Sequence, residues 1–113
     1  MASARAAERG LAIATTCIDL TIDGLPPGPF DLACCFHYRQ PGLAERIRPV
    51  LRDGAVVVLE LATVRNLERH ARPSRRFLAE PGELLRELGS FRVPYYSEGW
   101  VDDRSLARIV AVK

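Results

Sequence analysis

The segment FDLACCF at residues 30–36, together with AVVVLEL at residues 55–61, decides the fold of this chain. Both segments are short, almost entirely apolar and bounded by turn-forming residues, which is typical of strands buried on both faces. The β-branched valines make the second segment the clearest strand in the sequence. We expect the two strands to be parallel and adjacent.

The connection between these strands is predicted to form one helix. Pro41 suits the first turn of a helix, where its missing N–H group leaves no hydrogen bond unmade, and Asp53-Gly54 would end the helix. A strand, a helix and a strand with short joins form a βαβ unit, whose crossover is almost always right-handed. The apolar stripe of the helix has i, i+4, i+7 and i+8 spacing and consists of Leu43, Ile47, Val50 and Leu51.

The rest of the chain completes an α/β pattern. Residues 81–88 begin with a proline and predict a second helix, and residues 91–96 and 106–112 predict two antiparallel strands. The segment over 97–105 is long for a tight hairpin. Ahead of the first quoted strand, residues 2–9 are predicted to be the end of a helix and 11–20 a strand. The apolar stripe of the second helix consists of Leu84, Leu85 and Leu88.

Length and composition exclude several classes of protein. The 113 residues suit a single domain, and a formal net charge of +2 is too small to indicate wholesale nucleic-acid binding. No apolar run approaches the ~18 residues of a membrane span, and the start lacks the apolar stretch of a signal peptide. Cys17, Cys34 and Cys35 have neither zinc-site spacing nor an even count. We expect them to be core residues of a cytoplasmic protein without a metal site.

Three motifs, in their order and spacing, resemble class I S-adenosylmethionine-dependent methyltransferases. Phe30-Asp31-Leu32 resembles the "FDLV" of the family's fourth strand, and LRDG at residues 51–54 resembles the "LRPGG" turn into the fifth strand. FLAEPGEL at residues 77–84 is similar to a pattern in the small bacterial branch related to tellurite-resistance methyltransferases. The resemblance implies a Rossmann-like methyltransferase sheet, with one partial domain over residues 1–113.

One motif of that family is missing. The family carries an acidic, glycine-rich "DxGxGxG"-like loop after its first strand, where the loop holds the cofactor against a helix N-terminus. No such segment occurs here. The family's strand order, 3-2-1-4-5-7-6, makes residues 11–20 the third strand and residues 30–36 the fourth. We therefore expect an N-terminally truncated fold that lacks the first two strands.

Removal of those two strands leaves an unpaired strand edge. The edge along residues 30–36 would present free N–H and C=O groups, which invite pairing with another chain. Either residues 11–20 move in to pair with this strand, or a partner supplies the missing strands. Self-association or a partner at this edge is therefore expected.

The resemblance also implies cofactor-binding positions for S-adenosylmethionine. In the family, an acidic residue after the third strand accepts a hydrogen bond from the adenine amine, which makes Asp19 the candidate. A solvated loop position is the alternative for Asp19. Ile18 and Leu20 would flank the adenine as apolar walls. Phe36 follows the fourth strand, where the family places side chains that face cofactor and substrate.

Candidate catalytic residues follow from the usual place of ligands, beyond the carboxyl ends of the strands. His37 and Tyr38 come directly after the strand over 30–36, and a histidine there is suited to orient a substrate or accept a proton. A turn residue with satisfied hydrogen bonds is the alternative for His37. Glu60 is the only charge in its strand, so we expect it to face the same rim, with Thr63 nearby, or a neighbouring cation.

Residues 65–76 are the densest positive stretch of the sequence. They contain five arginines and His70, which together attract a carboxylate, a phosphate or a nucleic-acid backbone. Apart from Phe77 no aromatic residue is interleaved, which disfavours a stacking platform for single strands. A solvated loop is the main interpretation of this stretch.

The sequence therefore predicts a methyltransferase-derived protein with a small-molecule acceptor, inactive as the isolated chain. Displacement at the sulfonium methyl group needs alignment and not a nucleophilic side chain, so the acceptor is not constrained. Two alternatives remain: a non-enzymatic subunit that docks through the open strand edge, and an anion- or nucleic-acid-binding module built on residues 65–76. Neither a membrane nor nucleic acid is the expected partner.

Overall fold

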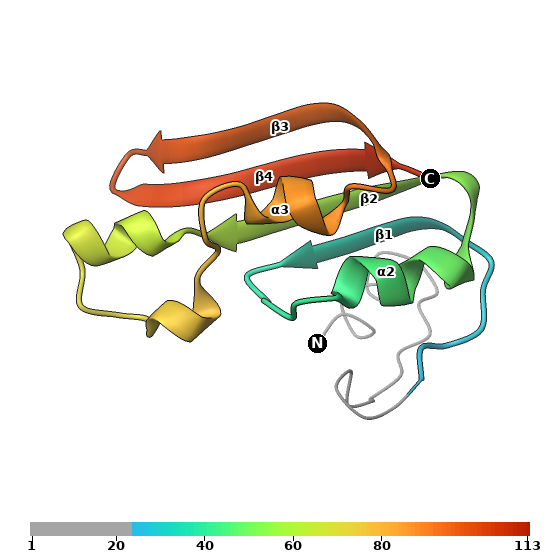
Figure 1. Cartoon of the computed structure of the whole chain (residues 1–113), viewed down its shortest axis with the longest axis horizontal. Helices are drawn as coiled ribbons and strands as arrows, with labels where there is room; N and C mark the ends of the chain where they lie inside the picture. The colour runs from blue at the N-terminus through green and yellow to red at the C-terminus, as the bar shows by residue number, and fades with distance from the viewer. Residues whose placement is uncertain (1–23) are drawn as a thin grey trace, which may run out of the picture.

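A computed structural model describes residues 24–113, which form one four-stranded sheet with short helices (Figure 1). The strands are β1 (Phe30–Phe36), β2 (Leu51–Ala62), β3 (Arg92–Val101) and β4 (Arg104–Val112). They lie in the order β1-β2-β4-β3. β1 and β2 are parallel, and β4 is antiparallel to both of its neighbours. The sheet is therefore mixed, and the predicted α/β class is confirmed at this coarse level.

The amino-terminal predictions lie outside the described residues. These are the helix over 2–9, the strand over 11–20 and the position of Cys17. Within residues 24–113, no helix has both the length and the apolar character needed to cross a membrane.

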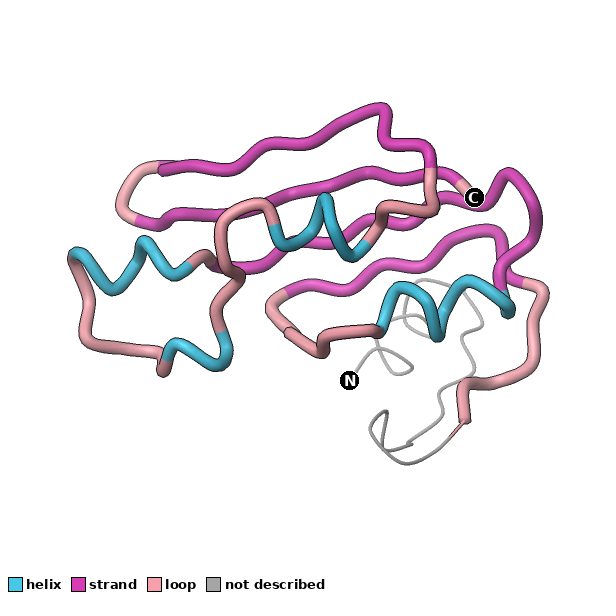
Figure 2. The backbone as a smooth tube through the Cα atoms, viewed as in Figure 1, coloured by secondary structure: helices cyan, strands magenta, loops and turns pink. Residues whose placement is uncertain are grey.

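The helix between the parallel strands is shorter than predicted. α2 spans Leu43–Ile47 and continues as the 3-10 helix η1 (Arg48–Val50), as the tube in Figure 2 shows. Pro49 in η1 has no N–H group to continue the α-helical hydrogen bonds, which explains the early end. Leu51, predicted as part of the helix stripe, instead opens β2 and is buried there.

β3 and β4 form a tight hairpin, so the prediction of a long connection over 97–105 is wrong. Val101 pairs with Arg104, which leaves only Asp102 and Asp103 in the turn. Asp102 adopts a φ of +56°, a left-handed conformation that aspartate tolerates better than most residues. The polar residues before this turn belong to an edge strand, where polar side chains reach solvent. The predicted antiparallel pairing is confirmed.

The helices α2 and α3 (Glu83–Glu87) lie on the same face of the sheet in Figure 1. The buried core on this face includes Ala44 from α2, Leu84 from α3 and Leu88 at the C-terminal end of α3. The strands contribute every second residue, because successive side chains point to opposite faces. These sheet residues of the core are Ala55, Val57, Leu59, Leu61, Ala107, Ile109 and Ala111.

We call the opposite side of the sheet the open face. The strand register places alternate residues of three strands on it. In β2 and β4 most of these residues are only half-buried, unlike their neighbours on the core face. The open face of β1, β2 and β4 carries Leu32, Cys34, Phe36, Val56, Val58, Glu60, Ala62, Leu106, Arg108, Val110 and Val112.

β1 is not buried on both faces, contrary to the prediction from its composition. Ala33 and Cys35 pack against the core, whereas Leu32 and Phe36 are 55% and 54% exposed on the open face. β1 is the outermost strand of the described sheet, and α2 and α3 cover only its other face. Cys34 is exposed and is therefore not a core residue, while the prediction that Cys34 and Cys35 do not share a site is confirmed.

A buried amide attaches the chain after β2 to the sheet. The 3-10 helix η2 spans Val64–Glu68, and Asn66 within it donates from Nδ2 to the carbonyl oxygens of Thr63 and Ser105, each at 2.8 Å. Asn66 Oδ1 accepts from the Ser105 amide at 3.0 Å, and the hydroxyl groups of Thr63 and Ser105 are 2.6 Å apart. We call these three buried residues the Asn66 anchor.

The second predicted helix is also shorter than expected. After the 3-10 helix η3 (Arg75–Phe77), the chain turns at Gly82 with a φ of +69°, so α3 begins only at the following residue. Leu84 and Leu88 are buried as predicted, but Leu85 is 42% exposed. Consecutive residues lie about 100° apart around a helix axis, so Leu85 turns out of the stripe.

Candidate functional site

The carboxyl ends of β1 and β2 meet at one edge of the sheet, where Phe36 lies in register with Glu60. This is the edge beyond which α/β sheets usually bind their ligands. It brings together the catalytic candidates His37 and Glu60. The other predicted cofactor residues, Ile18, Asp19 and Leu20, lie outside the described residues.

Glu60 is the centre of a polar cluster on the open face. Arg108, in register with Glu60 on β4, donates from Nε to Oε1 at 2.6 Å, and His37 Nε2 lies 3.4 Å from Oε2. The Glu60 side chain is 18% exposed and that of His37 is 55% exposed. The carboxylate thus faces a cation, as expected, while the imidazole is open to a ligand.

The backbone positions His37 next to Glu60. His37 has a φ of +60°, which is uncommon for a residue other than glycine, and its N–H group donates to the Glu60 carbonyl oxygen at 2.9 Å. His37 is therefore a turn residue whose side chain also borders the candidate site. The interpretation as a turn residue with satisfied backbone hydrogen bonds is confirmed, and a role in orienting a substrate or accepting a proton stays a prediction.

Phe36 and Tyr38 have different surroundings. Phe36 is exposed on the open face, in register with Glu60. Tyr38 is also exposed, but its hydroxyl group donates to Gln40 Oε1 within the same loop at 2.6 Å. Of the two, Phe36 is better placed to contact a ligand at this edge.

The loop that carries His37 and Tyr38 is attached to α3 through Arg39. Arg39 donates from Nε and Nη2 to the two carboxylate oxygens of Glu83, both at 2.7 Å, and from Nη1 to the Arg76 carbonyl oxygen at 2.9 Å. Burial acts to raise the pKa of Glu83, but hydrogen bonds from Arg39 and the Glu80 amide outweigh it and lower that pKa. The hydrogen bond to Glu83 raises the pKa of Arg39. Both groups are charged at neutral pH.

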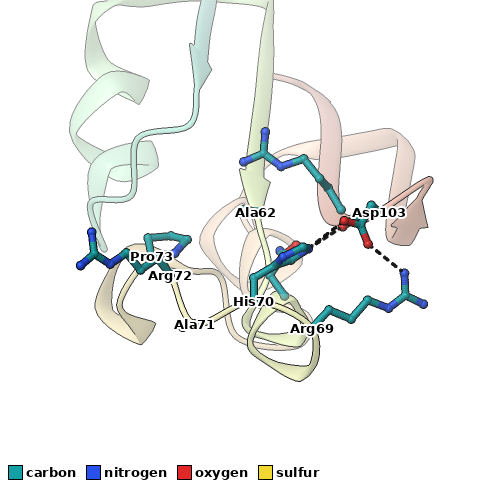
Figure 3. Close-up of a pocket in the computed structure, with 9 residues that line it drawn as sticks. Ala62, Arg69, His70, Ala71, Arg72, Pro73 and Asp103 are labelled. Atoms are coloured by element: carbon teal, nitrogen blue, oxygen red, sulfur yellow. Dashed lines mark hydrogen bonds and ion pairs between the residues drawn. The ribbon is translucent and has the colours of Figure 1, made fainter.

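An open pocket of about 710 Å³ lies at the carboxyl end of β2, next to Ala62 (Figure 3). Residues 69–73 form one wall, and residues 103–104 of the β3–β4 turn form another. In Figure 3, Arg69 and His70 reach toward Asp103, while Arg72 lies on the other side of the pocket. We call this the basic pocket, with the polar lining residues Asn66, Arg69, His70, Arg72, Asp103 and Arg104.

Asp103 compensates part of the charge in the basic pocket. Its Oδ1 lies 3.5 Å from Arg69 Nη1, and its Oδ2 lies 3.2 Å from His70 Nε2, as the dashed lines in Figure 3 mark. The Arg69 guanidinium also lies over the Trp100 ring, 3.8 Å from its centroid, in a cation–π contact. Arg69 is therefore held from two sides.

Two other arginines of the 65–76 stretch are paired outside the pocket. Arg65 Nε lies 3.1 Å from Glu68 Oε2, and Arg75 Nη2 lies 2.8 Å from Glu80 Oε1. Hydrogen bonds to these carboxylates raise the pKa of both arginines. These two pairings interrupt the positive charge along the stretch.

Sequence reasoning missed the residues of the β3–β4 turn and the Asn66 anchor. Asp103 and Arg104 enter the pocket only because the hairpin is tight, and the turn-favouring pair Asp102-Asp103 would have indicated this. Thr63, predicted at the rim, is 1% exposed and bonded to Ser105, so it supports the site without contacting a ligand. Within residues 24–113, no group of three or more His, Cys, Asp or Glu side chains is arranged to hold a metal ion.

Comparisons with known proteins find similar solved structures. No family model matches the sequence, and no curated protein matches it. Among solved structures, the chain is similar to TehB from Haemophilus influenzae, with a TM-score of 0.75 and 15% sequence identity. The match covers 97% of this chain and 44% of the TehB chain, so this chain spans less than half of the length of TehB. At this identity the match shows that the chain shares part of the fold of TehB.

Proposed function

We propose that this chain forms the second half of an S-adenosylmethionine-dependent methyltransferase fold and contributes its acceptor side. The observation that carries the proposal is the strand order. The order β1-β2-β4-β3, with one parallel and two antiparallel pairs, is the 4-5-7-6 order that ends the family's sheet. The TM-score of 0.75 to TehB supports the same assignment.

The residues at the carboxyl ends of β1 and β2 suit the acceptor side. Phe36 offers an exposed apolar wall, and His37 offers an accessible imidazole that orients an acceptor or takes its proton. The Glu60 carboxylate, paired with Arg108, lies beside that imidazole. When bound, the cofactor supplies the electrophilic methyl group, so these residues need only align a small-molecule acceptor and exclude water.

The cofactor half of the site is only partly represented in this sequence. By the resemblance, Ile18, Asp19 and Leu20 frame the adenine, whereas the glycine-rich loop that holds the ribose and methionine moieties does not occur. The sequence therefore fits the edge of a cofactor site and not a whole one. We expect the isolated chain to bind the cofactor weakly and to show no turnover.

An NMR titration of the isotope-labelled chain with S-adenosylhomocysteine, the stable product, tests this proposal. We expect a dissociation constant on the order of 1 mM or weaker, with amide shifts confined to the ends of β1 and β2 around Phe36, His37 and Glu60. Amides of β3 serve as the internal control and should not move. No shifts at saturating ligand, or shifts away from this edge, would contradict the proposal. Micromolar binding would contradict the expected incompleteness of the site.

The DNA upstream of Met1 provides an independent check. An in-frame segment that encodes the glycine-rich loop would support a single longer methyltransferase. A separate protein that carries this loop and co-purifies with the chain would support a split one. In either case the assembled protein should bind S-adenosylmethionine more tightly than the chain alone.

A non-enzymatic subunit that docks through β1 is the second candidate function. The observation that favours it is the position of β1 at the edge of the described sheet, with Leu32 and Phe36 more than half exposed. An apolar strand at a sheet edge is a template for pairing with another chain. The occupant would be a second copy or a partner that carries the missing strands.

Light scattering across a range of concentrations separates this candidate from the first. We expect the wild-type chain to self-associate and Leu32→Lys to shift it toward the monomer, because a charge on an edge strand opposes pairing. Leu85→Lys, at an exposed leucine of α3, is the matched control and should leave the association unchanged. A wild-type chain that stays monomeric would exclude a second copy of the chain as the occupant of the β1 edge.

A further inference from the structure

The basic pocket carries more positive charge than its own acid balances. Three arginines against one aspartate leave a lining charge of +2 with His70 neutral. Asp103 contacts Arg69 and His70. Within residues 24–113, Arg72 and Arg104 are exposed and have no carboxylate within ion-pair distance.

We propose that the basic pocket binds a small organic anion, a molecule that carries a carboxylate or phosphate group. Guanidinium groups donate paired hydrogen bonds to both kinds of oxyanion, which makes arginine the usual residue at such sites. The volume of about 710 Å³ lies within the usual range for pockets that hold small molecules. This binding requires no cofactor and is therefore independent of the proposed methyl transfer.

The Asn66 anchor holds both walls of the pocket in place. The Asn66 side chain bonds to the backbone of Ser105, the residue after Arg104. The backbone carbonyl oxygen of Asn66 accepts from the amides of Arg69 at 3.1 Å and His70 at 2.8 Å. One buried residue thus connects the 69–73 wall to the β3–β4 turn. A site that is formed before the ligand arrives loses less entropy on binding.

Asp103 occupies the place that an incoming anion would take. Its carboxylate already contacts Arg69 and His70, and its side chain is 70% exposed, so water can replace these contacts at little cost. The Arg69 guanidinium, stacked on Trp100, keeps its N–H edge available to the replacing oxyanion. Asp103 therefore lowers the affinity of the pocket, and its neutralisation should raise that affinity.

The charges favour a small anion over a nucleic acid. Arg65 and Arg75, which flank residues 69–73 in the sequence, are each paired with a glutamate, so their charges are balanced outside the pocket. The Trp100 ring is covered by Arg69 and also faces Arg65, at 5.7 Å, and is not free to stack on a base. A continuous path for a polymer backbone is therefore lacking among the described residues.

Trp100 provides the readout, because it is the only tryptophan of the chain and contacts Arg69 directly. The experiment titrates the chain with sodium pyrophosphate and, separately, with sodium citrate at low ionic strength, and records tryptophan fluorescence. We expect a saturable change with at least one of the two. The preferred anion identifies the ligand group as phosphate or carboxylate.

Four variants separate the pocket from general charge effects. Arg104→Gln and Arg72→Gln should each weaken binding by about tenfold, and Asp103→Asn should tighten it severalfold. Arg52→Gln makes the same change in net charge at an exposed arginine outside the pocket, paired with Asp31, and should change binding less than about twofold. Circular-dichroism melts confirm that each variant is folded, which is expected because all four positions are exposed.

Three outcomes would overturn the inference. The first is the absence of a saturable change with either anion. The second is an equal loss for Arg52→Gln and Arg104→Gln, which would indicate a general charge effect. The third is tighter binding of a single-stranded oligonucleotide that weakens in Arg65→Gln and Arg75→Gln, which would assign the surface to nucleic acid. None of these readouts depends on S-adenosylmethionine, so they do not test the methyltransferase proposal.

Discussion

Arg39 and Glu83, 44 residues apart in the sequence, form a two-point ion pair with both N–O distances at 2.7 Å. The pair joins the loop after β1 to the first turn of α3, and its side chains are 19% and 10% exposed. Bidentate pairs shielded from water contribute more to stability than exposed pairs. This contact therefore holds in place the loop that carries His37.

Glu83→Gln should destabilise the protein in a pH-dependent way. At pH 7 we expect the free energy of unfolding to fall by about 1–3 kcal/mol, measured by urea denaturation. Because the fold lowers the pKa of Glu83, its contribution is complete above the pKa of an unperturbed glutamate, about 4.3. The contribution is lost as the pH falls through the lower pKa of the folded state. The deficit of the variant should therefore shrink in acid.

Glu68→Gln is the control for this prediction. Glu68 also pairs with an arginine, but both side chains of that pair are more than half exposed. Because water screens this exposed pair, we expect a much smaller loss at pH 7 than for Glu83→Gln. Equal losses for the two variants would show that the Arg39–Glu83 pair has no special role.

Asn66→Ala should be among the more damaging single substitutions. It leaves the buried Ser105 amide without its acceptor and removes one of the donors to each of the carbonyl oxygens of Thr63 and Ser105. We expect the free energy of unfolding to fall by about 2–4 kcal/mol, measured by thermal and urea denaturation. Leu67→Ala, at an exposed neighbour in η2, should cost less than about 1 kcal/mol. A neutral Asn66→Ala would refute the role of the anchor.

Leu88→Ala and Leu85→Ala form a matched pair at the α3 side of the core. Leu88 is fully buried in the core cluster, so its truncation should cost about 2–5 kcal/mol. Leu85 is exposed, so its truncation should cost less than about 0.5 kcal/mol. Urea denaturation of both variants measures the difference. A similar cost at both positions would contradict the described orientation of α3.

Cys34 should react with an alkylating reagent faster than Cys35. Cys34 is exposed on the open face, whereas burial, assisted by the charge of Cys34, raises the pKa of the Cys35 thiol. Since the thiolate is the reactive form, we expect at least about a tenfold difference in rate at pH 8. Single-cysteine chains, made with Cys17→Ser and a serine at the other position, allow iodoacetamide rates to be measured separately. Equal rates would contradict the strand orientation of β1.

Much of the sheet was predictable because its signal is local. The apolar runs over 30–36 and 55–61 indicated two strands wherever their neighbours lie, and both are present as β1 and β2. The burial of β1 was not predictable from its composition. An apolar run shows that a strand can be covered on both faces, while the coverage itself depends on which helices pack there.

The candidate site was predictable only in part. The carboxyl ends of parallel strands must meet, so His37 and Glu60 could be placed together from the sequence. The pairing of Glu60 with Arg108 could not be predicted in this way, because the two residues are 48 positions apart and meet only through the register between β2 and β4. The basic pocket likewise depends on the tight β3–β4 turn.

The sequence by itself determined which segments carry the strands and helices of residues 24–113, though not where each one ends, because apolar periodicity, valine content and prolines act over a few neighbouring residues. Only the tertiary structure decided which charges are paired. Arg39 meets Glu83, and Asn66 meets Ser105, through strand register and loop paths that no local pattern contains. The physical reason is that ion pairs and hydrogen bonds depend on distances of a few ångströms in space. The same rule separates Arg65 and Arg75, which are paired, from Arg72 and Arg104, which leave the basic pocket positive.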